Sequence, residues 1–352
     1  YLPYLRFKGN IFTCQGNRTD FRFVDITQLA VPFDGVPNSL GFRAQAMTLK
    51  FLDPAAQGLF FKPTLKLADI LVKVSRLGSK PSGEVVHHRA HIGERTSLVY
   101  LPLYRRQDRL FDAVTNRPIL TLPAGREIIP PFSAPPASWR LNILPTLCPV
   151  CGWHLEGEKD SAALVCRNCE RVFETSSGRF APVEHVIVAG SGEETTFLPF
   201  WRMTATSTTP PMQSFADFIR ITRQPRIPPP EWEKMPLSFW CPAFRIRPKI
   251  FLQLLRTATM AQPPCPGSVS FGQKPLFPVT LPASEAAQSL KLALADLTIK
   301  KSDLFPLLPK TRFTVVRTTL AYLPFRDNGR ELTQSGSSIT IDKNALDFGR
   351  KL

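Results

Sequence analysis

The sequence predicts an α+β protein in which two duplicated β-rich modules flank a cysteine-rich segment that binds a metal. Three observations lead to this prediction: an aromatic-Leu-Pro phrase that recurs, two closely spaced C-x-x-C pairs, and a high content of proline. The chain has 352 residues, which is too many for one small core, and 35 of them are proline. Because proline breaks helices and is confined to turns and strand edges, we expect short strands joined by stiffened connections.

The aromatic-Leu-Pro phrase occurs four times, and each copy ends in an arginine. The copies begin at Tyr1, Tyr100, Phe197 and Tyr322, and their arginines are Arg6, Arg105, Arg202 and Arg326. The later three copies follow Thr-containing runs of high β-propensity. We therefore expect edge or terminal strands, where the missing N–H of proline does little harm.

Other landmarks keep one order in the two halves of the chain, which indicates an internal duplication. We place one module copy at residues 1–125 and the second at 190–352, lengthened by proline-rich insertions such as 226–230. Superposition of the copies is expected to match Pro3 with Pro199 and Pro102 with Pro324, and to bring Arg43 near Arg245. The matched landmarks are Ile26-Thr27 with Ile221-Thr222, Phe42-Arg43 with Phe244-Arg245, and Leu59-Phe60 with Leu276-Phe277.

Within the modules, β-prone runs predict strands at 11–13, 21–24, 97–101, 183–188, 195–203 and 312–322. Ser284 is expected to N-cap a helix that continues through Leu297. Pro248 suits the first position of a second helix, which runs to about Met260. A third helix is predicted at residues 65–77, where Gly78 ends it. Prolines then predict a linker at 126–144.

Four of the seven cysteines form two C-x-x-C pairs, which are separated by fourteen residues: Cys148 with Cys151, and Cys166 with Cys169. Each pair turns back on itself, so two pairs complete a tetrahedral S4 shell for one structural Zn²⁺. Gly152 suits the tight turn after the first pair, since positive φ is easy for glycine. Glu170 stands at the corresponding position of the second pair. A rubredoxin-like iron site is an alternative, but it would want a second C-P-x-C-G.

This segment resembles the zinc-ribbon family over residues 145–180, with short strands expected at 153–155 and 163–165. Four thiolate ligands leave no open position for water, so the metal should be structural. The whole chain resembles uncharacterised bacterial zinc-ribbon proteins in which Y-L-P-aromatic phrases flank or follow the ribbon. That resemblance implies a helper of larger assemblies, membrane-associated ones included, and it transfers no catalytic residue.

The net charge of +16 favours acidic partners, which are nucleic acid, an anionic membrane surface or an acidic protein. The alternative is that the charge only keeps the protein soluble. The arginines of the phrase are the candidate contacts, unless they cap strand ends or pair with carboxylates. No stretch approaches the roughly 20 apolar residues of a transmembrane segment, so none is expected. Thiolate ligands and single cysteines suit a reducing compartment, so we expect a cytoplasmic protein.

Familiar catalytic motifs are absent, including the phosphate-binding G-x-x-x-x-G-K-[ST], G-x-G-x-x-G, H-E-x-x-H and G-x-S-x-G. His87, His88 and His91 form the one histidine cluster, and on a strand His87 and His91 would share a face. They either ligate a metal or shuttle protons, or they belong to a solvated strand. Cys241 is either a nucleophile or a buried small hydrophobe.

These observations favour a non-enzymatic adaptor or scaffold subunit of a larger protein assembly. A nucleic-acid-binding zinc-ribbon protein is the first alternative, and an enzyme without a familiar motif is the second. The folded surface discriminates the first two hypotheses. One continuous positive groove would favour nucleic acid, whereas scattered charge beside exposed apolar residues would favour protein partners.

Overall fold

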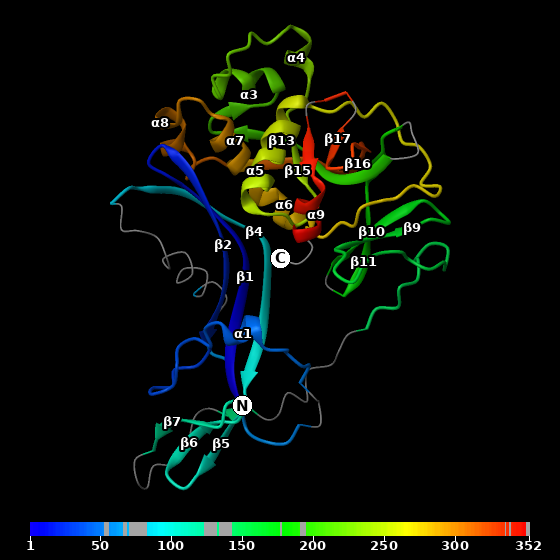
Figure 1. Ribbon diagram of the computed structural model, residues 1–352. Coiled ribbons are helices and arrows are strands. Elements are labelled where there is room, and N and C mark those ends of the chain that lie inside the picture. The colour runs from blue at the N-terminus through cyan, green and yellow to red at the C-terminus, as the bar shows by residue number, and fades with distance from the viewer. Residues whose placement is uncertain are drawn as a thin grey trace. The chain divides into compact units, whose positions relative to one another are not determined.

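The computed structural model describes residues 1–52, 56–65, 69, 83–122, 132–133, 143–176, 178–190, 195–334, 336–337 and 339–349. Over these residues the fold is mixed and strand-rich, in agreement with the α+β class (Figure 1). The chain divides into two compact units. Unit one contains residues 1–9, 23–82 and 94–142, and unit two contains 10–22, 83–93 and 143–352. Most of the predicted helix at 65–77 and most of the predicted linker at 126–144 lie outside the described residues.

The N-terminal strands form a three-stranded sheet in the order β2-β1-β4, which contributes residues to both units. Its strands are β1 (Leu2–Gln15), β2 (Arg18–Leu29) and β4 (Val86–Leu101). Gly16, with φ of 53°, and Asn17 form the tight turn between β1 and β2. The strands predicted at 11–13, 21–24 and 97–101 lie inside these longer strands.

Unit one also holds short elements that follow or cover this sheet. Helix α1 spans Arg43–Ala46, and strand β3 (Phe60–Phe61) pairs with β8 (Phe132–Ser133), which falls inside the predicted linker. Strands β5 (Leu103–Arg106), β6 (Arg109–Asp112) and β7 (Arg117–Thr121) form an antiparallel meander.

A seven-stranded sheet organises unit two. Strands β13 and β16 are its centre, and they pair antiparallel from Thr195 opposite Arg326 to Ser207 opposite Phe313. Strands 195–203 and 312–322 were predicted and are confirmed, whereas only residues 185–187 of the predicted strand 183–188 belong to this sheet. Its strands are β12 (His185–Ile187), β13 (Thr195–Thr208), β14 (Pro211–Met212), β15 (Ser238–Pro242), β16 (Phe313–Asp327), β17 (Glu331–Gln334) and β18 (Thr340–Asp342).

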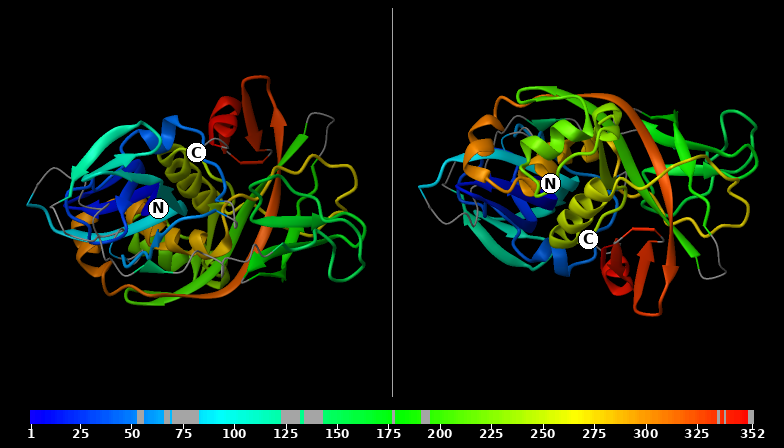
Figure 2. Two further views of the ribbon diagram at one scale, coloured as in Figure 1. Left: turned by 90° about the horizontal axis from the view of Figure 1, so that it is seen from below. Right: turned by 90° about the horizontal axis from the view of Figure 1, so that it is seen from above.

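Helix α5 (Pro248–Ala261) lies along β15 and beside α7 (Leu290–Leu297) (Figure 2). It begins at the predicted proline, and it buries Phe251, Leu254 and Leu255 in the core of unit two. The prediction for the later helix is wrong at its start. Pro282 rather than Ser284 precedes α6 (Ala283–Ala286), and a 3₁₀ turn at residues 287–289 separates α6 from α7.

The remaining helices are short. Helix α3 was not predicted, although its capping box is readable in the sequence: Ser214 Oγ accepts from Asp217 N at 3.1 Å, and Asp217 Oδ2 accepts from Ser214 N at 3.0 Å. These helices are α3 (Phe215–Ile221), α4 (Glu231–Lys234), α8 (Lys301–Leu304) and α9 (Lys343–Gly349).

One predicted landmark of the duplication is wrong. Ile26 and Thr27 lie in strand β2, whereas Ile221 ends helix α3 and Thr222 caps it. The reason is the connection between strands: a tight turn joins β1 to β2, but residues 209–237, with α3 and α4, lie between β13 and β15. A helix in this insertion therefore carries the Ile-Thr pair that resembled a strand.

Pro199 and Pro324 lie inside the sheet rather than at its edge, which corrects the expected strand position. On the side of β13 away from β16, Phe277 N donates to Phe197 O at 2.9 Å and Ala243 N donates to Pro199 O at 3.0 Å. Pro199 thus lies where the neighbour of β13 changes from residues 275–277 to the end of β15, so its missing N–H leaves no hydrogen bond of the sheet unmade. Pro324 has a similar place, because pairing of β16 with β12 ends at Tyr322 and pairing with β17 starts at Phe325, so Pro324 lies between the two partners.

The first and third copies of the phrase make the same backbone hydrogen bonds, each within its own unit. In unit one, Tyr1 N donates to Leu59 O (2.8 Å), Phe61 N to Tyr1 O (3.1 Å) and Ala30 N to Pro3 O (2.9 Å). In unit two, the corresponding donors and acceptors are Phe197 N to Pro275 O (3.0 Å), Phe277 N to Phe197 O (2.9 Å) and Ala243 N to Pro199 O (3.0 Å).

The correspondence continues along both chains. Ala30 O accepts from Thr64 N and Leu65 N, and Ala243 O accepts from Thr280 N and Leu281 N. Strand order is also alike, because β1 lies between β2 and β4 as β13 lies between β15 and β16. These bonds pair Phe61, rather than the expected Phe60, with Phe277.

Candidate metal centre

The two C-x-x-C pairs are carried by a small sheet and the loop before it. Strands β9 (Ala163–Cys166), β10 (Arg171–Ser176) and β11 (Arg179–Val183) pair antiparallel in the order β11-β10-β9. The strand predicted at 163–165 is therefore confirmed. At 153–155 there are only single bridges nearby, from Leu147 to His154 and from Glu156 to Val165.

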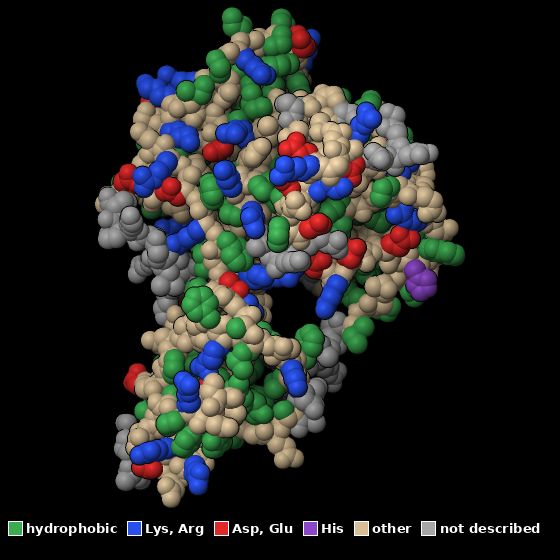
Figure 3. Space-filling view, in the orientation of Figure 1, with side chains coloured by type: hydrophobic (Ala, Val, Ile, Leu, Met, Phe, Trp, Pro, Cys, Tyr) green, Lys and Arg blue, Asp and Glu red, His purple; other side chains and the backbone are tan. Residues whose placement is uncertain are grey.

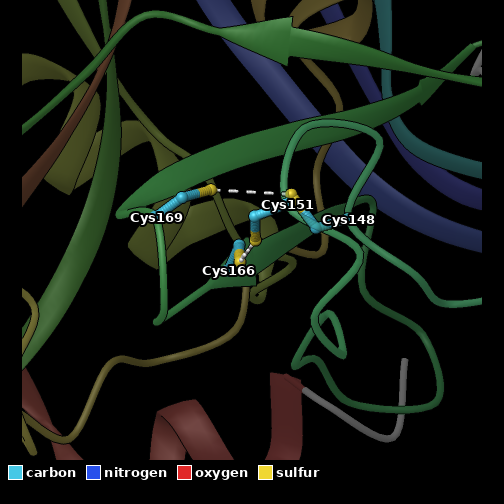
Figure 4. Close-up of side chains that lie close together, drawn as sticks. All are labelled: Cys148, Cys151, Cys166 and Cys169. Atoms are coloured by element: carbon cyan, nitrogen blue, oxygen red, sulfur yellow. Dashed lines mark hydrogen bonds between the residues drawn. The ribbon is translucent and has the colours of Figure 1, made fainter.

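The four sulfurs lie within 4.8 Å of one another (Figure 4). Cys148 Sγ is 3.5 Å from Cys169 Sγ, and Cys151 Sγ is 3.5 Å from Cys166 Sγ. Zn–S bonds of about 2.3 Å at tetrahedral angles separate neighbouring sulfurs by about 3.8 Å. The donor set and its spacing therefore fit a metal ion such as zinc, and this is the sole group of three or more His, Cys, Asp or Glu ligand atoms so placed among the described residues.

The residue that follows each C-x-x-C pair has a left-handed backbone conformation. Gly152 has φ of 72°, as predicted, and Glu170 has φ of 53°. A residue with a side chain pays about 1–2 kcal/mol for this conformation relative to the right-handed one. The turns also aim backbone N–H groups at sulfur, as where Val150 N donates to Cys148 Sγ at 3.4 Å.

The thiols differ in acidity because their surroundings differ. Hydrogen bonds from the Asn168 side chain and the Trp153 backbone N–H lower the pKa of Cys151 to about 6. Burial raises the pKa of Cys166, while burial and the neighbouring thiols raise that of Cys169 to about 12. Four thiolates so close together repel one another, and a bound divalent cation offsets that repulsion.

The second pair is tied to a distant loop of unit two, at residues 270–274. Arg167 Nη1 donates to Gly272 O at 2.6 Å and Nη2 donates to Lys274 O at 3.2 Å. Glu170 Oε1 accepts from Phe271 N at 3.2 Å and also from the Ser270 hydroxyl. These bonds explain why a glutamate, and not a glycine, occupies the left-handed position.

The first pair presents apolar side chains to solvent instead. Leu147 is 46% exposed, Val150 52% and Trp153 56%. All three flank or lie between Cys148 and Cys151, and we call them the knuckle tip. Several large apolar side chains exposed together are typical of a binding surface.

Each unit contains two of the four arginines of the repeated phrase. Arg6 pairs with Asp25 at 2.7 Å in unit one, and Arg105 Nε donates to Gln107 O at 2.8 Å. In unit two, Arg202 is half-buried opposite Thr319, whereas the exposed Arg326 lies seven residues farther along β16, a spacing of about 23 Å. The expectation that such an arginine pairs with a carboxylate is therefore met at Arg6.

The histidine cluster lies on β4, where His87 and His91 share one face and are partly exposed while His88 lies on the other face. His88 shares its strand face with Ala90 and Ile92, which are core residues of unit two. Burial, and then the charges of Lys291 and His91, lower the pKa of His88 to about 4, so its ring is neutral at pH 7. The solvated-strand alternative is therefore wrong for His88, because β4 turns alternate residues toward the core.

Cys241 is fully buried, and burial raises its pKa to about 12. A thiol in this state is not the thiolate that a nucleophile requires. Its surroundings therefore favour the small-hydrophobe interpretation. No helix among the described residues combines the length and the apolar character needed to cross a membrane.

No protein-family model, curated protein or solved structure matches the chain.

Proposed function

We propose that this chain is a non-enzymatic adaptor or scaffold subunit of a larger protein assembly, with one structural Zn²⁺ in a zinc ribbon at residues 145–180. The observation that best supports this proposal is the difference between the two C-x-x-C pairs. The second is fastened to the loop 270–274 through Arg167 and Glu170, while the first exposes the knuckle tip. A bound metal would hold the exposed apolar side chains of the first pair rigid relative to the second pair, which is fixed to the loop 270–274. A rigid, exposed apolar surface suits the binding of another protein.

A structural role for the metal follows from its proposed ligands. Cys148, Cys151, Cys166 and Cys169 supply four sulfurs, so the Zn²⁺ shell is closed and has no position for substrate or water. The metal instead holds together a segment whose own apolar core is small. That core consists of Leu155 and Phe173 together with the buried Cys148 and Cys166.

A duplicated scaffold is the second part of the proposal. Two copies of one module, at residues 1–125 and 190–352, would flank the ribbon. The support is the set of backbone hydrogen bonds shared around Pro3 and Pro199, together with the common strand order. Repetition of a framework, with different loops on each copy, suits extended contact with large partners.

Nucleic-acid binding is the second candidate, favoured by the net charge of +16 and by the habits of zinc ribbons. On the face drawn in Figure 3, however, Lys and Arg side chains are scattered among acidic and hydrophobic ones. Several arginines are also engaged in ion pairs, such as Arg6 with Asp25 and Arg317 with Glu184. Scattered charge beside exposed apolar residues favours a protein partner.

The test is purification of the full chain from the cells that produce it, at moderate and at high salt. A variant with Val150→Glu and Trp153→Ser changes the knuckle tip without touching a cysteine. The matched control is Ile227→Glu, because Ile227 is 95% exposed in the same unit. We expect a stoichiometric protein partner that survives salt, is lost from the tip variant and is retained by the control, with the metal content equal in all three.

Two results would contradict the proposal. One is a partner that the tip variant and the control retain equally. The other is co-purifying nucleic acid whose affinity falls steeply with salt, since neutralised phosphates release counterions. The second result would establish the nucleic-acid candidate instead.

A further inference from the structure

A two-point ion pair joins β1 to β2 in unit one. Arg6 Nε donates to Asp25 Oδ1 at 2.8 Å, and Arg6 Nη2 donates to Asp25 Oδ2 at 2.7 Å. The two side chains are only 17% and 11% exposed. The planar guanidinium therefore has a matched carboxylate in a largely buried place, which is the strong form of this interaction.

Arg202 holds the corresponding position in unit two. Arg6 lies three residues after Pro3 and Asp25 five residues before Ala30, which donates to Pro3. Counted in the same way from Pro199 and Ala243, the corresponding residues are Arg202 and Ser238. A buried serine thus replaces the carboxylate, and its Oγ lies 3.1 Å from Thr204 Oγ1.

Two buried N–H donors at this position, one on Arg202 and one on Trp240, lack acceptors within the described part of the chain. Arg202 Nε is buried without a hydrogen-bond partner there. Trp240 stands opposite Arg202 in the β13–β15 pair, and its ring centroid is 5.7 Å from the guanidinium carbon. Trp240 is 1% exposed, and its Nε1 also has no partner among those residues. Leaving a buried donor unsatisfied costs about 1–3 kcal/mol.

We propose that the partly exposed side of the Arg202 guanidinium binds a carboxylate supplied from outside the chain, as the guanidinium of Arg6 binds Asp25, beside the ring of Trp240. Arginine and carboxylate match in shape as well as charge, and a carboxylate accepts several hydrogen bonds at once. The carboxylate belongs either to an acidic side chain of a protein partner or to a free small acid. The inference is separate from the knuckle tip, and neither depends on the other.

The experiment follows the indole ¹⁵N–H signals of the full zinc-loaded chain while sodium acetate is added, with sodium chloride at equal ionic strength as the reference. Trp240→Phe assigns the signal. We expect a saturable shift of the Trp240 signal with acetate and none with chloride. Arg202→Gln should abolish the shift, and Ser238→Asp should abolish it by supplying an internal carboxylate.

A second variant, in unit one, keeps the test decisive if the Ser238→Asp protein does not fold. Asp25→Ser removes the carboxylate beside Arg6, and we expect it to lower the melting temperature and acetate to recover part of that loss. Stronger binding of a capped glutamate peptide than of acetate or succinate identifies a partner's side chain as the source, and the reverse order identifies a free acid.

Absence of an acetate-specific shift would overturn the inference, as would a shift that persists in Arg202→Gln. The first result means that stacking on the Trp240 ring is the complete partner of Arg202. Loss of the protein partner in the knuckle-tip variant has no bearing on either result, so the two proposals fail separately.

Discussion

Glu170 accepts a hydrogen bond from the backbone N–H of Phe271 at 3.2 Å while its own backbone stands at φ of 53°. The residue therefore combines an unfavourable conformation with a favourable contact 101 positions away. The conformation is required by the turn after Cys169, and the contact fastens that turn to the loop 270–274 of the same unit. These two effects can be separated, because a glycine at position 170 would relieve the backbone strain without making the contact to Phe271.

Replacement of Glu170 should distinguish strain from docking. Glu170→Ala keeps the strained φ and loses two hydrogen bonds, so we expect the free energy of unfolding to fall by about 2 kcal/mol. Glu170→Gly loses the same bonds but relieves about 1 kcal/mol of backbone cost, so it should be the more stable of the two. Denaturant titration measures both values.

Hydrogen exchange supplies the second readout for these variants. Both should exchange faster than the wild type at residues 270–274 while retaining the metal. Equal stability of the Ala and Gly variants, or unchanged exchange in that loop, would contradict this account.

The metal prediction is one zinc per chain, bound by four sulfurs at about 2.3 Å each. Cys166→Ser should lose the metal and unfold residues 145–180 locally, while the two modules stay folded, because the ribbon depends on its ligands for stability. Elemental analysis and X-ray absorption measure content and bond length. Cys265→Ser is the control and should keep the zinc, whereas iron in the wild type would favour the rubredoxin-like alternative.

Stability should depend on pH through His88. Its folded pKa of about 4 lies below the ordinary 6.5, so as pH falls the unfolded chain takes up this proton first. The free energy of unfolding should therefore drop between pH 6.5 and 4, by on the order of 2–3 kcal/mol from this residue. Urea titrations of the wild type and His88→Gln isolate the effect as a difference. The difference should shrink steadily over that range, and a constant difference would contradict the prediction.

Replacement of Pro199 tests whether this proline matches the point where the neighbour of β13 changes from residues 275–277 to β15. Pro199→Ala introduces a backbone N–H on the side of β13 that faces residues 275–277 and β15. The neighbouring hydrogen bonds there, made by Phe197 and Ala243, provide no acceptor for it. We expect a loss of about 2 kcal/mol, since an orphan buried donor adds to the greater freedom of the unfolded chain. Pro225→Ala is the exposed control and should lose less than 1 kcal/mol. Equal losses would mean that the new N–H finds an acceptor.

Local signals in the sequence were sufficient for the cysteine cluster and for helix α5. Two residues between cysteines bring their sulfurs together within one turn, and Pro248 followed by apolar residues on one face specifies a helix start and a buried side. Helix α3 was missed even though Ser214 and Asp217 carry its signal within four residues. These features depend on neighbours in the chain, which is why a single sequence contains them.

The strand positions of the prolines and the solvation of the histidines depended on distant residues. Pro199 avoids a lost hydrogen bond only because residues 275–277 and β15 meet beside it. His88 is neutral because β4 turns it toward a core made mostly of later residues. Neither arrangement has a local signature, since each arises when segments far apart in sequence pack together.

The recurring phrase shows the division most clearly. By itself the sequence determined that Arg6 and Arg202 follow the same aromatic-Leu-Pro pattern, and that four cysteines share one centre. Only the tertiary structure decided that Arg6 meets the carboxylate of Asp25 while Arg202 stands against Trp240, with no carboxylate partner among the described residues. The similar phrases at Tyr1 and Phe197 share their backbone hydrogen bonds, but the partner of each arginine is set by the residues that the neighbouring strand places beside it.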